Sequence, residues 1–171
     1  GDWSSDVCSS DLEYHLIHKS TIDTVLDKAR QYRSLREPDL AISICIDVFA
    51  VDSDNQDALV IYILALTDQY SHQHAKVQPK KIVEFIAKLK SEFHRIYYTG
   101  IFLERKARAL LKNPMSQSFA YEGLMEAIAK YEIAEKMAPK HCSDPILRYN
   151  SCLRTIEKEN LQPRAEFDEL Y

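Results

Sequence analysis

The chain has 171 residues with 22 basic and 26 acidic side chains, a formal net charge of −4. This balance gives no electrostatic reason to bind nucleic acid or an anionic membrane surface. The longest apolar run, from Ala58 to Leu66, is too short to cross a bilayer. We therefore expect a single domain with no nucleic-acid partner and no membrane insertion.

The first twelve residues, GDWSSDVCSSDL, have neither helical nor strand periodicity. From Asp2 to Leu12 they resemble the conceptual translation of a sequencing-library adapter. We therefore expect residues 1–12 to be a leader outside the fold, with Trp3 unburied. Without them the chain has 23 acidic and 22 basic side chains and is nearly neutral. On this interpretation the natural start of the protein is unknown, and the final AEFDELY can be a fragment end.

Three cysteines remain, Cys45, Cys142 and Cys152. Their odd number, wide spacing and apolar neighbours indicate buried, reduced thiols rather than a disulfide framework. Reduced thiols are typical of a cytoplasmic protein, which is the localisation we expect.

Helical periodicity starts after the leader and predicts three helices in the first half of the chain, at residues 21–36, 38–51 and 56–70. Ser20 can cap the first helix, and Pro38 suits the first turn of the second. Asp54 or Asn55 can cap the third helix. That helix is apolar on nearly every side, so we expect it at the centre of the fold.

The second half predicts four more helices, starting near residue 80, near residue 96, near residue 119 and at residue 146. Pattern breaks at SHQHAKVQP, near residues 91–94, at NPMSQS and at Ala138-Pro139 separate them. Asp144 can cap the last helix, which we expect to end near Lys158. No segment has strand periodicity. The sequence thus predicts an all-α domain of about seven helices at residues 13–160, followed by a polar tail at 161–171.

Two segments repeat the same spacing of small and larger residues. Residues 41–48 (AISICIDV) align with residues 127–134 (AIAKYEIA) without a gap, and Pro139 follows the second copy. The second copy resembles the second helix of a tetratricopeptide repeat, and Ala29 and Tyr32 stand where that family carries its first-helix residues. This resemblance implies antiparallel helix pairs stacked in a right-handed solenoid.

The sequence also departs from that family. Gly100, in YYTGIFLE, resembles a first-helix position, but it lies 27 residues before Ala127 where the family has twelve. Ile63 stands where a small residue is expected. The pair in the middle of the chain therefore matches weakly.

Two groups of residues superficially resemble parts of chemical sites. His72 and His74 lie in a polar loop, but two histidines cannot complete a tetrahedral zinc site and no further ligand stands beside them. Cys142 and Cys152 lie near His141, yet Cys152 falls on an apolar stripe, which favours a packed thiol over a nucleophile. The sequence also contains no phosphate-binding glycine loop, HExxH or GxSxG motif. We therefore expect no enzyme, no catalytic residue, no cofactor and no metal.

The family resemblance implies that the first helix of each pair lines a groove that receives a protein or peptide partner. Helical phase then gives these groove candidates: Asp23, Leu26, Arg30, Arg33, His94, Tyr97, Ile101, Glu104, Arg105 and Asn150. Leu26, Arg30 and Tyr97 occupy the places comparable to the carboxylate clamp of chaperone-binding members, so that clamp is not reproduced.

The resulting hypothesis is a protein–protein interaction scaffold or adaptor, of bacterial appearance, that binds a peptide or a partner helix. The alternative is a regulatory or docking domain of a larger enzyme or transcription regulator. Homo-oligomer formation is compatible with either function.

Overall fold

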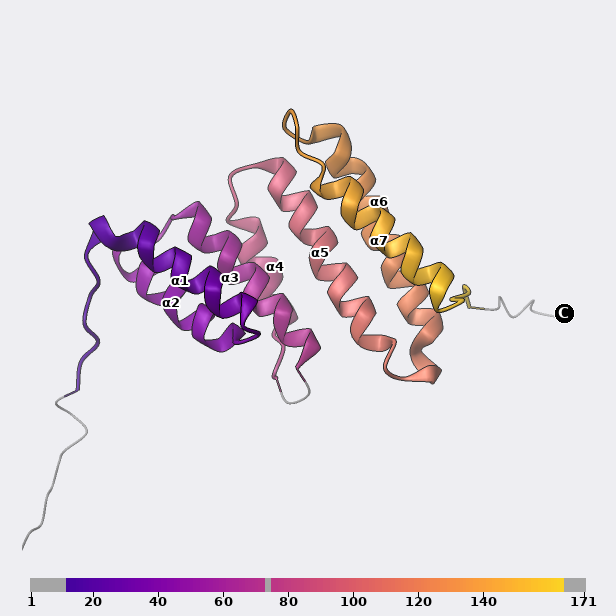
Figure 1. Cartoon of the computed structure of the whole chain (residues 1–171), viewed down its shortest axis with the longest axis horizontal. Helices are drawn as coiled ribbons and strands as arrows, with labels where there is room; N and C mark the ends of the chain where they lie inside the picture. Colours follow the sequence, from indigo (N-terminus) through magenta and orange to yellow (C-terminus); the bar gives the residue numbers. More distant parts are fainter. Residues whose placement is uncertain (1–11, 73–74, 165–171) are drawn as a thin grey trace, which may run out of the picture.

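The computed structural model describes residues 12–72 and 75–164, and within them the protein is helical with no strand. Its seven α-helices follow one another side by side in chain order (Figure 1): α1 (Ile22–Ser34), α2 (Pro38–Val51), α3 (Gln56–Asp68), α4 (Pro79–Ala87), α5 (Glu92–Leu110), α6 (Gln117–Met137) and α7 (Asp144–Lys158). Three short 3-10 helices accompany them: η2 (Lys19–Thr21), η3 (Gln69–Ser71) and η4 (Pro114–Ser116). The all-α prediction is confirmed. The expected leader, with Trp3, lies outside the described residues except for the exposed Leu12.

Local chemistry explains most helix starts. The side chain of Asn55 accepts a hydrogen bond from the backbone N–H of Ala58 at 2.9 Å, which caps α3 as predicted. Ser91 caps α5 in the same way. The expected cap at Ser20 is wrong, because that residue lies inside η2 and Thr21 occupies the N-cap position. Ser143, not Asp144, stands at the N-cap of α7.

Helices α1 and α7 both end through a residue in the left-handed region, Arg36 with φ 63° and Asn160 with φ 48°. After α7 the backbone N–H of Leu161 donates to the carbonyl of Ile156 at 3.0 Å. This C-terminal motif turns the next side chain back onto its own helix. Leu161, expected in the polar tail, is therefore 3% exposed and belongs to the core.

The apolar side chains form two clusters. The N-terminal core is made by α1–α4, by Leu89 just after α4 and by Phe102 of α5. The C-terminal core is made mainly by α5–α7 and by Leu161. Helix α3 is buried on most of its surface, as predicted. Leu64 of α3 packs against the C-terminal core, and Tyr98 of α5 packs against both, so α3 and α5 join the two cores.

Consecutive helices pack against one another, and contacts also join α1 to α3 and α3 to α5. Helices α1, α3 and α5 thus form a connected layer. Hydrogen bonds and an ion pair between side chains of α5 and α7 join α7 to this layer. Helices α5 and α6 make the most extensive contact. None of the described helices is both long and apolar enough to cross a membrane.

Candidate interaction face

The structure divides the ten predicted groove residues into three groups. Asp23 and Arg30 are exposed on α1, and His94 and Asn150 are half-buried. Arg30 is already paired with Asp27 on its own helix at 2.8 Å. These positions keep surface that a partner can reach.

Leu26, Ile101 and Tyr97 belong to the cores instead. Leu26 and Ile101 are each 2% exposed, and Tyr97 is 8% exposed. Burial also raises the pKa of the Tyr97 phenol. Their side chains pack between helices, so they have almost no surface for a partner and are removed from the predicted groove.

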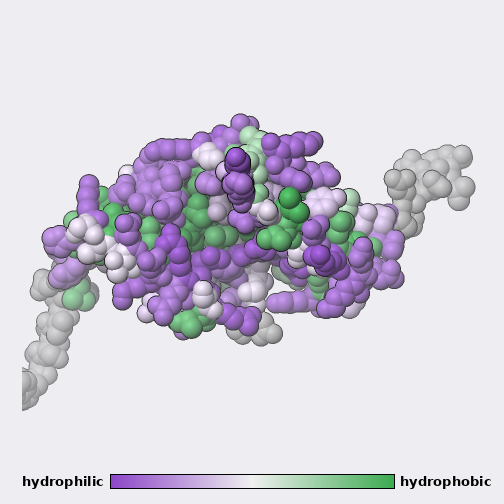
Figure 2. Space-filling view, turned by 45° about the horizontal axis from the view of Figure 1, so that its top comes forward, coloured by the Kyte–Doolittle hydropathy of each residue, from purple (hydrophilic) through white to green (hydrophobic). Residues whose placement is uncertain are grey.

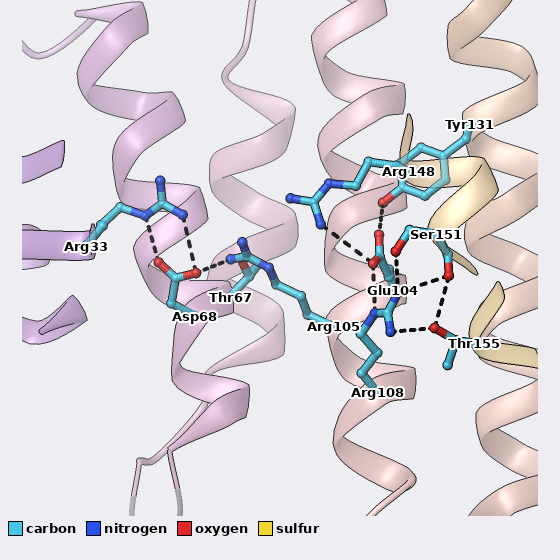
Figure 3. A network of polar contacts seen from close by, with 10 residues as sticks. All are labelled: Arg33, Thr67, Asp68, Glu104, Arg105, Arg108, Tyr131, Arg148, Ser151 and Thr155. Carbon is cyan, nitrogen blue, oxygen red and sulfur yellow. Dashed lines mark hydrogen bonds and ion pairs between the residues drawn. The ribbon is translucent and has the colours of Figure 1, made fainter. Parts of the chain in front are cut away.

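The remaining three, Arg33, Arg105 and Glu104, lie in polar clusters between helices (Figure 3). The first cluster is centred on Asp68, the last residue of α3. The Nε of Arg33 donates to Asp68 Oδ2 at 2.7 Å and its Nη2 donates to Oδ1 at 3.3 Å. Arg105 pairs with Oδ1 of the same carboxylate and also donates to Thr67 Oγ1 at 2.6 Å. One carboxylate therefore receives arginines from α1 and α5.

Sequence reasoning missed Asp68, although a signal was present. A carboxylate at the C-terminal end of a helix is opposed by the helix dipole. Asp68 ends a helix whose middle, from Ala58 to Leu66, is apolar, so a cationic partner for it was to be expected. Arg105 is largely desolvated, and this burial lowers its pKa, while Asp68 acts in the opposite direction.

The second cluster is centred on Glu104 of α5, whose side chain is 1% exposed. The hydroxyl of Tyr131 donates to Glu104 Oε2 at 2.6 Å, and Arg108 Nε donates to Oε1 at 2.8 Å. Arg148 of α7 approaches Oε1 at 3.6 Å. Burial and the neighbouring carboxylate raise the pKa of Tyr131, so its phenol keeps its proton and remains a donor. The Glu104 carboxylate is thus buried, accepts two hydrogen bonds and forms an ion pair with Arg148, and Glu104 is removed from the predicted groove surface.

Arg108 extends the polar contacts onto α7. Its Nη1 donates to Thr155 Oγ1 at 2.7 Å and its Nη2 donates to Ser151 Oγ at 3.0 Å. We call the six charged side chains that run across α1, α3, α5 and α7 the polar ladder: Arg33, Asp68, Glu104, Arg105, Arg108 and Arg148. It contains four arginines but only two carboxylates.

A pocket of about 380 Å³ opens beside the Asp68 cluster. It lies between η3 with the end of α3 on one side and the C-terminal half of α5 on the other. Its lining residues are Thr67, Asp68, Tyr70, Ser71, Arg105, Arg108, Ala109 and Lys112. Three of these side chains are cationic and one is anionic.

Two further features of residues 12–72 and 75–164 bear on metal binding and on cysteine reactivity. These residues contain no group of three or more His, Cys, Asp or Glu side chains placed to hold a metal. His74, one of the two loop histidines, lies outside the described residues. Burial raises the pKa of both Cys45 and Cys152 to about 12, so these thiols are protonated and unreactive as nucleophiles.

No family model, curated protein or solved structure matches this chain. The polar ladder and the pocket beside it are therefore the observations from which a function can be inferred.

Proposed function

We propose that the protein is an interaction scaffold that holds a peptide segment or helix of a partner protein against the face formed by α1, α3, α5 and α7. The observation that carries this proposal is the polar ladder, which places charged side chains from all four of these helices on one layer.

The ladder retains contact with solvent. The side chains of its four arginines, Arg33, Arg105, Arg108 and Arg148, are between 19% and 36% exposed. Partly buried arginines fixed by neighbouring carboxylates are rigid donors, and arginine is enriched among the residues that anchor protein interfaces. A partner that lies along this layer meets side chains already held in place.

The surface composition agrees with polar recognition. On the face shown in Figure 2, hydrophobic residues form separate patches among hydrophilic ones. A specific interface of this type depends on a few anchoring contacts rather than on total apolar area.

We further propose a solenoid of the tetratricopeptide type as the architecture. Three observations support it. Consecutive helices pair, and odd-numbered helices also contact one another from α1 to α3 to α5. Tyr131, the aromatic residue of the AIAKYEIA segment, packs directly against Gly100 of the preceding helix.

Site-specific photo-crosslinking in cells of the source organism tests the scaffold function. A photoreactive amino acid replaces Lys112 on the rim of the pocket or, as the matched control, the exposed Lys136 on α6. We expect a discrete cross-linked partner from position 112 and not from position 136. Cross-links from position 136 alone, or from neither position, would contradict the proposal.

A further inference from the structure

The polar ladder has more positive charge than its own carboxylates can balance. Arg33 and Arg105 share Asp68, and Arg108 and Arg148 share Glu104. The six side chains therefore have an excess of two positive charges, although the whole chain has a net charge of −4. Partial burial of unbalanced charge costs free energy, and one arginine for each carboxylate would avoid that cost.

The excess charge borders the pocket. Lys112 is exposed on its rim, and Arg105 and Arg108 line its wall. The hydroxyl-bearing Tyr70 and Ser71 lie on the opposite side. The pocket thus has three cations on one wall, and hydroxyl groups with the Asp68 carboxylate on the other. Because the cations outnumber this one carboxylate, the pocket still suits an incoming anion.

Arg105 also has N–H groups that make no hydrogen bond within the described part of the chain. Its Nη1 makes hydrogen bonds to Leu64 O, Thr67 Oγ1 and Asp68 Oδ1. Within the described part of the chain, its Nε and Nη2 make none. The guanidinium is planar and suited to two-pronged contact with a carboxylate, as Arg33 already makes with Asp68.

We propose that this pocket binds a glutamate or aspartate side chain from an acidic segment of the partner protein. The proposal rests on the scaffold function and specifies the partner's chemistry. The pocket, about 380 Å³, has room for one such side chain with part of its backbone and is too small for a folded surface. A nucleic acid fits less well, because the chain has no excess of basic side chains to attract an extended polyanion outside the pocket.

Fluorescence anisotropy with a labelled peptide of alternating glutamate and alanine tests this chemistry. The control peptide has glutamine in place of glutamate and the same length. We expect the glutamate peptide to bind, the glutamine peptide to bind at least about tenfold more weakly, and the difference to shrink as salt screens the charges. Equal affinity for the two peptides would overturn the proposal.

Charge reversal locates the site. Lys112→Glu should weaken binding of the glutamate peptide about tenfold, whereas Lys136→Glu, with the same change in net charge, should alter it by no more than about twofold. Both lysines are exposed, so circular dichroism should show both variants folded. Equal effects of the two variants would overturn the proposal. Displacement of the probe by inorganic phosphate at lower concentration than by free glutamate would do the same.

The scaffold function and the acidic ligand of the pocket can be refuted independently of each other. A partner that cross-links from position 112, together with a glutamate peptide that does not bind, overturns the acidic ligand and leaves the scaffold function standing. Binding of the glutamate peptide without any cross-linked partner contradicts the scaffold function itself.

Discussion

The two cores are built on different principles. The N-terminal core consists of aliphatic side chains around α3, with Phe49, Tyr62 and Phe85 packed ring against ring at centroid distances of 4.6–6.0 Å. The C-terminal core encloses a buried carboxylate, Glu104, bonded to the hydroxyl of the buried Tyr131.

This difference predicts unequal tolerance to substitution. Apolar packing is non-directional, so it accepts volume-conserving changes at small cost. A buried charge depends on its partners, because removing the carboxylate leaves its donors without an acceptor and removing a donor leaves the carboxylate less well compensated. The C-terminal core should therefore be the more sensitive half to polar substitutions.

The largest expected effect is that of Glu104→Ala. It leaves Arg108, Arg148 and the Tyr131 hydroxyl without their shared acceptor, and should lower the free energy of unfolding by about 3–5 kcal/mol. The matched change Asp68→Ala should cost about 1–2 kcal/mol, because the Asp68 side chain is 21% exposed where that of Glu104 is 1% exposed, and Asp68 has no buried tyrosine hydroxyl as a partner. Urea denaturation measures both values. Equal losses would contradict the contrast between the two clusters.

The next effect is that of Gly100→Ala. A methyl group on Gly100 would lie 2.7 Å from Tyr131 Cε1, too close for a carbon contact. Moving Tyr131 disturbs its bond to Glu104, so we expect a loss of about 1–3 kcal/mol in thermal or urea unfolding. Where a helical glycine has no close neighbour, replacing it by alanine has the opposite effect and raises the free energy of unfolding by about 1 kcal/mol. Such a gain here would show that the α5–α6 contact is looser than described.

Replacing one buried tyrosine by phenylalanine in each core removes the same hydroxyl group from both, so the two losses of stability can be compared directly. Tyr131→Phe removes a donor to Glu104 and should destabilise the protein by about 1–2 kcal/mol. Tyr62→Phe, in the N-terminal core, should change stability by about 0.5 kcal/mol or less, because the Tyr62 hydroxyl makes no side-chain hydrogen bond within the described residues. Both values come from urea unfolding curves. The reverse order would contradict the proposed difference between the cores.

The smallest expected effect is a gain from Arg36→Gly at the end of α1. Arg36 is exposed and has φ 63°, where glycine is favoured over residues with a Cβ atom. We expect the free energy of unfolding to rise by about 0.5–1 kcal/mol relative to wild type. Arg36→Ala is the control, and a glycine variant no more stable than this alanine variant would argue against strain at this position.

The sequence predicts the helices well where local signals are strong. Helix α2 runs from Pro38 to Val51 as expected, because proline marks its start and DSDN its end. The central position of α3 also follows from its composition, since a helix with apolar residues all round must be covered.

The candidate site is much less predictable from the sequence. Glu104 and Arg105 are adjacent and both polar, yet Glu104 is buried and Arg105 keeps its guanidinium at the surface of a pocket. Helical phase identifies which residues face a layer but not how closely the next helix covers them. Asp68 lies 35 positions from Arg33 and 37 from Arg105, so only the packing of α1, α3 and α5 brings the three together.

An NMR titration with the glutamate–alanine peptide tests most directly the claim that the excess charge of the polar ladder forms a binding site. Amide shifts report where the peptide contacts the protein, independently of how tightly it binds. We predict that the largest shifts fall at residues 67–71 and 105–112, the two segments that line the pocket. Shifts confined to α2, α4 and α6, or none in these two segments at saturating peptide, would contradict the account.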